Sequence, residues 1–197
     1  MPDNPVVRGL APEGPALTHP NIVIPMPRTS PGATFHSWIS HPEGNGMPKS
    51  SDRRLRIGRF SETYRSYLVT TVTDARQPIF TDWSLGRLLV HAMKTEHDRG
   101  EVSSLAWVVM PDHLHWLFEL RSGELSEVVC RVKSRSTMVI NKATGRTGKL
   151  WRGGFHDRAI RRDESLITAA RYIVANPLRA GLVAKVGDYP LWDADWI

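Results

Sequence analysis

The chain has 197 residues, of which 41% are hydrophobic and 23% are charged, a composition typical of folded globular proteins. No window of eighteen apolar residues occurs, so no membrane-spanning helix is expected. The single cysteine, Cys130, excludes an internal disulfide and a zinc site built from cysteines. The N-terminus lacks the basic-then-apolar pattern of a secretion signal, which predicts a cytoplasmic protein.

The formal net charge is +6, and the excess is concentrated in the second half of the chain. Segment 121–183 contains thirteen Lys or Arg residues against five Asp or Glu residues. Such a segment favours a polyanionic partner, because each phosphate that a cation neutralises releases counterions. A solvated basic surface would explain a charge excess alone. The clustering of the excess in one segment favours nucleic acid as the partner.

Residues 1–55 have the composition of an extension rather than of a packed domain. Ten of the fourteen prolines lie in the first 48 residues, with no apolar period between them. Such a segment cannot bury enough apolar surface to offset the entropy lost on ordering. We therefore expect a flexible N-terminal extension over 1–55, or an upstream start codon assigned in error, and one folded domain over 56–197.

The rest of the chain alternates between patterns of strands and helices. β-Branched and aromatic runs predict strands, and apolar residues at helical spacing predict helices. The predicted elements are, in chain order, strand 64–73, helix 82–98, strand 102–110, strand 113–120, helix 125–142, strand 155–160 and helix 164–176. Asp82 and Asp163 are expected as N-caps, and Pro177 is expected to stop the last helix. This order predicts an α+β, ferredoxin-like split β-α-β fold with an antiparallel sheet.

Two histidines, His113 and His115, lie two residues apart in the predicted strand 113–120. Alternate side chains of a strand point to opposite faces, so both imidazoles share one face while Leu114 and Trp116 point into the core. Two neutral imidazole nitrogens at one point in space are half of a metal site. Taken alone, the pattern is more often a pair of exposed or hydrogen-bonded histidines.

The last predicted helix carries residues that would complete such a site. Tyr172 and Asn176 are four residues apart, so their side chains project from one helical face. Two imidazoles and the amide oxygen of Asn176 suit Mg²⁺ or Mn²⁺ and leave positions for water and a phosphate oxygen. Tyr172 would then be the nucleophile. A cation on the scissile phosphate would neutralise developing charge and hold the phosphorus in line, giving a covalent phosphotyrosine.

Three motifs together carry a resemblance to a known family. They are Met110-Pro-Asp-His-Leu-His115, Leu150-Trp-Arg-Gly-Gly-Phe-His-Asp157 and Tyr172-Ile-Val-Ala-Asn-Pro-Leu-Arg-Ala-Gly-Leu-Val183. In this combination and order the chain resembles the REP-associated tyrosine transposases, which are single-tyrosine members of the HUH nuclease superfamily. The resemblance extends from about residue 64 to residue 189. The chain departs from the family pattern in its long N-terminal extension and in the Leu-Trp-Asp-Ala-Asp-Trp sequence that replaces a serine-rich continuation.

The resemblance implies a ferredoxin-like HUH domain that cleaves and rejoins single-stranded DNA next to palindromic hairpins. It matches His113 and His115 to the paired metal ligands, Tyr172 to the nucleophile and Asn176 to the third ligand position. The implied partner is hairpin-bearing single-stranded DNA, bound in the nucleoid by a monomer or a homodimer without a membrane. The alternative, from another functional class, is a domesticated hairpin-binding protein that keeps the fold without turnover.

Residues near these motifs are candidates for DNA contact. They are Arg131, Lys133, Arg135, Trp151, Arg152, Arg158, Arg161, Arg162 and Arg179. Most of the cations are expected to contact phosphates, which fixes position rather than sequence. Trp151 could stack on an unpaired base, although a tryptophan is more commonly part of a core. His156 and Asp157 could support the metal ligands or have a structural role, and the sequence does not separate these two interpretations.

Overall fold

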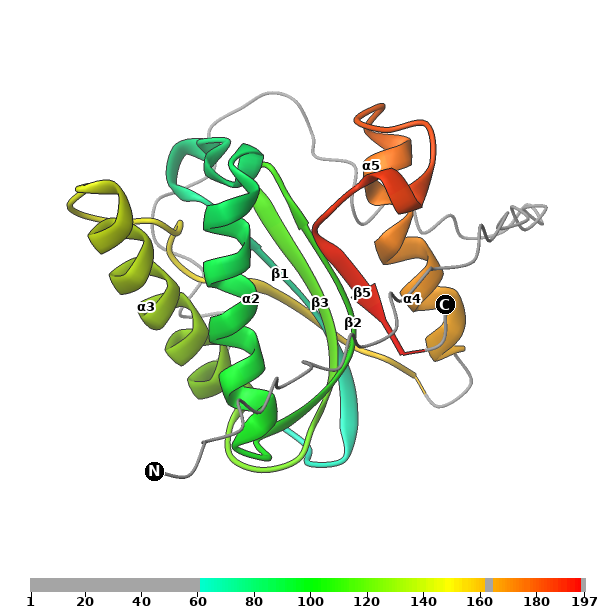
Figure 1. Cartoon of the computed structure of the whole chain (residues 1–197). Helices are drawn as coiled ribbons and strands as arrows, with labels where there is room; N and C mark the ends of the chain where they lie inside the picture. Colours follow the sequence, from blue (N-terminus) through cyan, green and yellow to red (C-terminus); the bar gives the residue numbers. More distant parts are fainter. Residues whose placement is uncertain (1–60, 162–164, 196–197) are drawn as a thin grey trace, which may run out of the picture. The chain divides into compact units, whose positions relative to one another are not determined.

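The computed structural model describes residues 61–161 and 165–195 (Figure 1). The expected extension over 1–55, together with Arg162 and Asp163, lies outside these residues. The described elements are β1 (Arg65–Val72), η2 (Asp74–Arg76), η3 (Ile79–Thr81), α2 (Trp83–Asp98), β2 (Val102–Met110), β3 (His113–Leu120), α3 (Leu125–Thr144), β4 (His156–Ala159), α4 (Leu166–Val174), α5 (Asn176–Arg179), η4 (Val186–Asp188) and β5 (Trp192–Ala194). Among them, no helix is long and apolar enough to cross a membrane.

The five strands form one antiparallel sheet in the order β4-β1-β3-β2-β5. The first four strands in this order have the ferredoxin-like arrangement, which confirms the predicted α+β fold class. The hairpin of β2 and β3 turns at Pro111-Asp112, as predicted. The fifth strand was not predicted, and it extends the sheet by pairing with β2.

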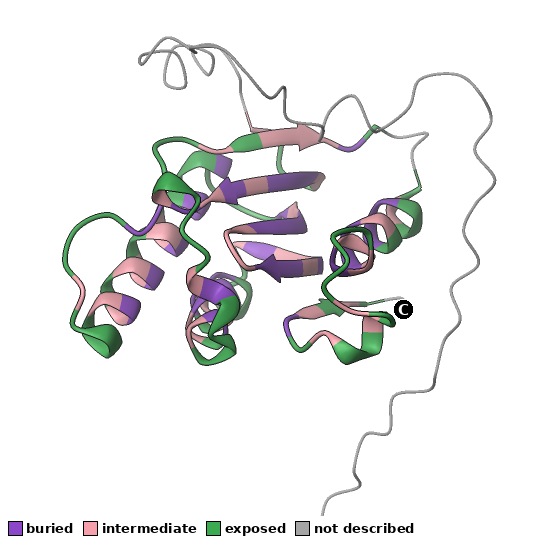
Figure 2. Cartoon of the chain, turned by 90° about the horizontal axis from the view of Figure 1, so that it is seen from above, coloured by how far each residue is buried: buried purple, intermediate pink, exposed green. Residues whose placement is uncertain are grey.

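Helices cover both faces of this sheet. α2 and α3 pack on one face, and α4 packs on the other, where it contacts β2, β3 and β5 (Figure 1). Buried residues gather in the sheet and on the helix faces turned toward it (Figure 2). The core under α2 and α3 includes Leu114, Trp116 and Phe118 of β3. The side chains that alternate with them therefore face α4, and these include His113 and His115.

Caps and breakers set the helix ends. The side chain of Asp82 accepts a hydrogen bond from the Ser84 backbone N–H at 2.9 Å, which confirms it as the N-cap of α2. The N-cap of α4 is Ser165 rather than the expected Asp163, and its hydroxyl accepts from the Thr168 backbone N–H at 3.3 Å. α3 extends two residues beyond its predicted end and stops at Gly145, which has a φ of 68°.

The expected helix 164–176 is interrupted at Ala175, just before Pro177. α4 ends at Val174, and α5 begins at Asn176 with Pro177 in its first turn. Proline has no N–H to donate to the carbonyl four residues earlier, which here belongs to Ile173. The side-chain amide of Asn176 donates to that carbonyl at 2.8 Å instead. Asn176 therefore satisfies a backbone group that the proline leaves without its usual donor.

Candidate functional site

The two histidines lie at the start of β3, next to the β2–β3 turn. Their ring centroids are 4.8 Å apart, and the ring planes are nearly perpendicular at 84°. His115 is buried, with 4% of its surface exposed, and the His113 side chain is 22% exposed. A nitrogen lies about 2.1 Å from a metal that it binds, so rings at this separation can share one ion. Both imidazoles belong to the sheet face that α4 covers.

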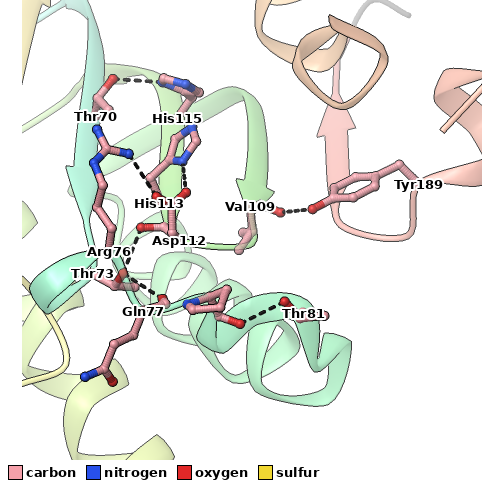
Figure 3. A network of polar contacts seen from close by, with 11 residues as sticks. Thr70, Thr73, Arg76, Gln77, Thr81, Val109, Asp112, His113, His115 and Tyr189 are labelled. Atoms are coloured by element: carbon pink, nitrogen blue, oxygen red, sulfur yellow. Dashed lines mark hydrogen bonds and ion pairs between the residues drawn. The ribbon is translucent and has the colours of Figure 1, made fainter. Parts of the chain in front are cut away.

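Each histidine is anchored through its Nδ1 atom (Figure 3). Nδ1 of His113 lies 2.5 Å from Oδ1 of Asp112, and Nδ1 of His115 lies 2.8 Å from Oγ1 of Thr70. The Asp112 carboxylate also accepts a hydrogen bond from Nη1 of Arg76 at 2.9 Å. The hydrogen bond with His113, assisted by Arg76, lowers the pKa of Asp112 to about 2. The carboxyl is therefore ionised at neutral pH.

Thr70 and Arg76 are not predicted as site residues by the sequence. Thr70 is 45 residues away from His115 in the chain, and it meets the histidine because β1 pairs with β3 in the register Thr70 opposite His115. Arg76 follows β1 in η2, where Ala75 and Arg76 have φ values of 51° and 52°. Residues with a side chain rarely adopt this left-handed conformation, and such strain concentrates at functional sites.

Thr73 connects the segment around η2 with the β2–β3 turn through hydrogen bonds (Figure 3). Its hydroxyl donates to the carbonyl oxygens of Gln77 at 2.8 Å and Asp112 at 3.0 Å. Its backbone N–H also donates to the Asp112 carbonyl, at 2.9 Å. Thr73 is completely buried, so these bonds are shielded from water. The segment that carries Arg76 is thus held against the residue that precedes the first histidine.

Tyr172, Asn176 and Arg179 form a cluster where α4 meets α5. The Arg179 guanidinium carbon lies 3.7 Å from the centroid of the Tyr172 ring, a cation–π contact. Nη2 of Arg179 also donates to Oδ1 of Asn176 at 2.6 Å. An amide oxygen has two lone pairs, so Oδ1 keeps one acceptor position beside this bond. The two residues expected to act together are therefore linked through Arg179.

The histidine pair and the tyrosine cluster share one face and one end of the sheet. α4 contacts β2 and β3, and α5 contacts β2. In Figure 1, α5 lies at the end of the sheet where β2 and β3 are joined. Within residues 61–161 and 165–195, no three His, Cys, Asp or Glu side chains form a group that could hold a metal ion. A third protein ligand for an ion at the histidine pair would have to be a side chain of another type, such as the amide of Asn176.

The pairing of β1 with β4 places His156 and Asp157 on opposite faces of the sheet. Thr70 of β1 lies opposite both His115 and His156, so these three side chains occupy one face of the sheet. His156 is exposed and stands two strands from His115, roughly 10 Å away at ordinary strand spacing. Asp157 lies opposite Val69, whose side chain belongs to the core under α2 and α3. Only His156 therefore lies on the face of the histidine pair.

The cations of α3 lie on the opposite face of the sheet and contact protein groups. Nε of Arg131 bonds to the buried Glu96 carboxylate at 2.8 Å, and Nη1 of Arg135 lies 3.6 Å from its other oxygen. Nζ of Lys133 donates to the backbone carbonyls of Arg152 and Gly154. These bonds connect α3 with α2 and with the loop before β4. Contact of Arg131, Lys133 and Arg135 with DNA remains a prediction.

The other candidates for DNA contact differ in exposure. Trp151 is buried and donates from its indole N–H to Oγ of Ser136 at 3.0 Å, so it is a core residue with no open face for a base. Arg152 and Arg161 are exposed. Arg158 lies opposite Leu68, in the set of residues that shares a face with Thr70.

Comparison with known proteins agrees with this geometry. Residues 62–176 match the family described as "Transposase IS200 like", and the chain belongs to this family. A REP-associated tyrosine transposase of Escherichia coli strain K12 is 32% identical over 108 residues, which are 53% of this chain and 61% of that protein. The match thus spans about three fifths of the relative's length.

A solved structure of a REP-associated tyrosine transposase bound to a REP hairpin is also similar. It aligns with a TM-score of 0.57 and 25% sequence identity, over 68% of this chain and 79% of that chain. The resemblance to REP-associated tyrosine transposases that the three motifs predict is therefore confirmed. The fold that the strand order defines is the fold of that transposase.

Proposed function

We propose that the protein cleaves and rejoins single-stranded DNA beside a palindromic hairpin, with Tyr172 as the nucleophile. The observation that carries the proposal is the sharing of one sheet face by the histidine pair and α4. The solved transposase that resembles this chain was captured on a REP hairpin, which supports a hairpin as the DNA element bound. Membership of a transposase family supports strand cleavage rather than binding alone.

In the proposed reaction, Oη of Tyr172 attacks the phosphorus of a phosphodiester. A bond forms between that oxygen and phosphorus, and the bond from phosphorus to the 3′ oxygen breaks. The phenol proton passes to solvent, and the released 3′ oxygen takes up a proton. The product is a 5′-phosphotyrosine and a free 3′ hydroxyl, and a second 3′ end can reverse the step. Arg179, stacked on the ring, would limit the orientations of the phenol.

The residues present fit a hard or borderline cation at the histidine pair. Both rings are anchored through Nδ1, which leaves Nε2 as the ligand nitrogen, and protein anchors of this kind are usual behind metal-bound histidines. Mg²⁺ or Mn²⁺ held by His113 and His115, with Asn176 as third ligand, would neutralise charge on the scissile phosphate. Asn176 would ligate through the acceptor position that Arg179 leaves on Oδ1.

The DNA would lie beside α4, over the part of the histidine-bearing sheet face that β1 and β4 form. Arg158 of β4 and the exposed His156 belong to that face. Arg152 lies next to the end of β1, where its backbone N–H donates to the Val72 carbonyl. The ion-paired Arg131 and Arg135 belong to the other face. We therefore infer that the contact made by Arg158 contributes more to DNA affinity than the contacts made by Arg131 and Arg135.

The test is adduct formation with a hairpin oligonucleotide that carries single-stranded flanks, incubated with Mn²⁺. We expect a protein–DNA adduct that survives denaturing electrophoresis with the native protein and none with Tyr172→Phe. Tyr64→Phe is the matched control, because Tyr64 is 72% exposed and a non-specific reaction would favour the more accessible phenol. Hairpin binding by the native protein without cleavage or adduct, over a panel of flanks, would overturn the proposal and favour the non-catalytic hairpin-binding protein.

A further inference from the structure

We propose that Asp112 and Thr70 are positioning residues for the histidine pair. Each accepts the Nδ1 proton of one ring, which holds His113 and His115 as Nδ1–H tautomers and presents both Nε2 atoms to one cation. The inference concerns the rings themselves, and its metal-binding consequence rests on the function proposed above. Neither Asp112 nor Thr70 is itself a ligand in this arrangement.

The contact to His113 has a defined direction. Oδ2 of Asp112 pairs with Nη1 of Arg76 at 2.9 Å, and Oδ1 of the same carboxylate meets Nδ1 of His113. A carboxylate can only accept hydrogen bonds, so the proton between Asp112 and His113 belongs to Nδ1 of the ring. The lone pair of the neutral ring is then on Nε2. Arg76 fixes the carboxylate from the other side, so the ring cannot turn without losing a charge-assisted bond.

The contact to His115 comes from a different strand. Thr70 lies opposite His115 in the β1–β3 register, and its Oγ1 is 2.8 Å from Nδ1. A threonine hydroxyl can donate or accept, so this contact fits either tautomer, and we assign the proton to Nδ1 because metal binding through Nε2 requires it. With Nδ1 donating to Thr70, the second ring has the same tautomer as the first. Two rings of one tautomer, 4.8 Å apart and nearly perpendicular, are arranged to share an ion through equivalent nitrogens.

The arrangement opposes the intrinsic preference of the ring. A neutral imidazole side chain in water favours the Nε2–H tautomer, which has no lone pair at Nε2 for a metal. The anchors reverse this preference before any ion arrives, so a cation meets ligands that are already correctly protonated. One anchor from the β2–β3 turn and one from β1 also restrict the rotation of each ring. Preorganisation of this kind raises affinity because less order has to be imposed on binding.

The direct test is nitrogen NMR of the histidine side chains in metal-free protein. The spectra are recorded at a pH of about 8, above the ordinary imidazole pKa, and the two neutral tautomers of an imidazole have distinct nitrogen shifts. We expect both His113 and His115 to be Nδ1–H tautomers in the native protein. Asp112→Ala should return His113 to the Nε2–H tautomer and Thr70→Val should do the same for His115, each without changing the other ring. An Nε2–H tautomer at either ring of the native protein overturns the inference.

Mn²⁺ affinity without DNA is the second readout. Asp112→Ala and Thr70→Val should each weaken Mn²⁺ binding by about 10- to 100-fold, the usual effect of removing a group behind a ligand. Thr70→Ser keeps an acceptor oxygen at position 70 and should stay close to the native Mn²⁺ affinity, whereas Asp112→Asn has one oxygen for Arg76, turns its NH₂ donor toward Nδ1, and should lose as much as Asp112→Ala. Asp98→Ala is the matched control, because it removes a carboxylate from the exposed Lys94–Asp98 ion pair on α2.

The two proposals fail in different ways. Unchanged Mn²⁺ affinity in Asp112→Ala and Thr70→Val, with affinity lost in His113→Ala, overturns the positioning role and leaves the metal site standing. Mn²⁺ affinity unchanged in His113→Ala overturns the metal site instead, and the tautomers of the two rings still decide the inference made here. Circular dichroism of each variant separates these results from loss of folding.

Discussion

Replacement of Gly86 by alanine should destabilise the protein, although the same change inside most helices is stabilising. Gly86 lies in α2, where alanine is favoured over glycine by about 1 kcal/mol. A methyl group on Gly86 would overlap Cδ1 of Leu191 and would lie 3.1 and 3.3 Å from its Cδ2 and Cγ. Leu191 is only 3% exposed, so its side chain cannot move aside into solvent.

The size of the effect follows from these opposing terms. Overpacking of a filled core costs about 1–3 kcal/mol, so after the gain of about 1 kcal/mol the net loss expected for Gly86→Ala is up to about 2 kcal/mol. Leu191→Ala alone should cost about 2–5 kcal/mol because it leaves a cavity. In the Leu191→Ala background the added methyl has room, and Gly86→Ala should then stabilise the protein by about 1 kcal/mol. The sign of the Gly86→Ala effect therefore reverses with the residue at 191.

Urea denaturation of the four proteins in this cycle measures the prediction. A difference of about 1.5 kcal/mol shifts the midpoint by about 0.5–1.5 M for an ordinary m-value. The same sign for Gly86→Ala in both backgrounds would mean that Leu191 does not occupy the space beside Gly86. The result also bears on β5, since the Leu191 carbonyl accepts from the Val109 backbone N–H just before β5 joins the sheet.

Three further predictions concern other parts of the molecule. Glu96→Gln should lower the free energy of unfolding by about 1.5–3 kcal/mol, measured by thermal denaturation, because Glu96 is 1% exposed and holds Arg131; an unchanged Tm would contradict this. Burial raises the pKa of Tyr189 to about 12, above its ordinary value of 10.0, so the folded state retains a proton that the unfolded state loses. Tyr189→Phe lacks the 2.7 Å hydrogen bond from the phenol to the Val109 carbonyl and should be less stable than the native protein. This difference in the free energy of unfolding should stay constant below pH 10.0 and shrink as the pH rises from 10.0 to about 12. Hairpin affinity should fall steeply with salt in a binding titration, and Arg158→Ala should reduce the salt slope whereas Arg135→Ala should not.

The sequence predicts the central elements of the fold well because their patterns are long. β2 and β3 begin and end at the residues expected from their apolar runs and from the Pro111-Asp112 turn. The common face of His113 and His115 follows from the two-residue period of a strand, and the core position of Leu114 is in agreement with it. Patterns within one segment thus establish which face carries the candidate ligands.

Features that depend on contacts between segments could not be predicted. Thr70 meets His115 only through the pairing register of two strands, which no local pattern specifies. β5 has three residues, one of them an aspartate, and its position on the edge of β2 is set by Tyr189 and Leu191 rather than by β propensity. Glu96 can be buried on α2 because Arg131 and Arg135 of α3 pair with its carboxylate.

The division of the last helix has a local cause that the sequence does contain. The sequence predicts that Pro177 ends the helix, whereas in the structure it lies in the first turn of a short second helix that begins at Asn176. Proline fits the first turn of a helix as well as it ends one, and the pattern of apolar residues does not distinguish these two uses. The amide of Asn176, bonded to the Ile173 carbonyl, makes the difference at this junction.

The central claim is that Tyr172 is the residue that receives the DNA strand. Its most direct test is peptide mapping by mass spectrometry of the protein–DNA adduct, formed with hairpin oligonucleotides labelled at either the 3′ or the 5′ end. The adduct should retain the 3′ label, release the 5′ label, and carry its nucleotide on the peptide that contains Tyr172. Attachment to another residue, or retention of the 5′ label, would contradict this claim.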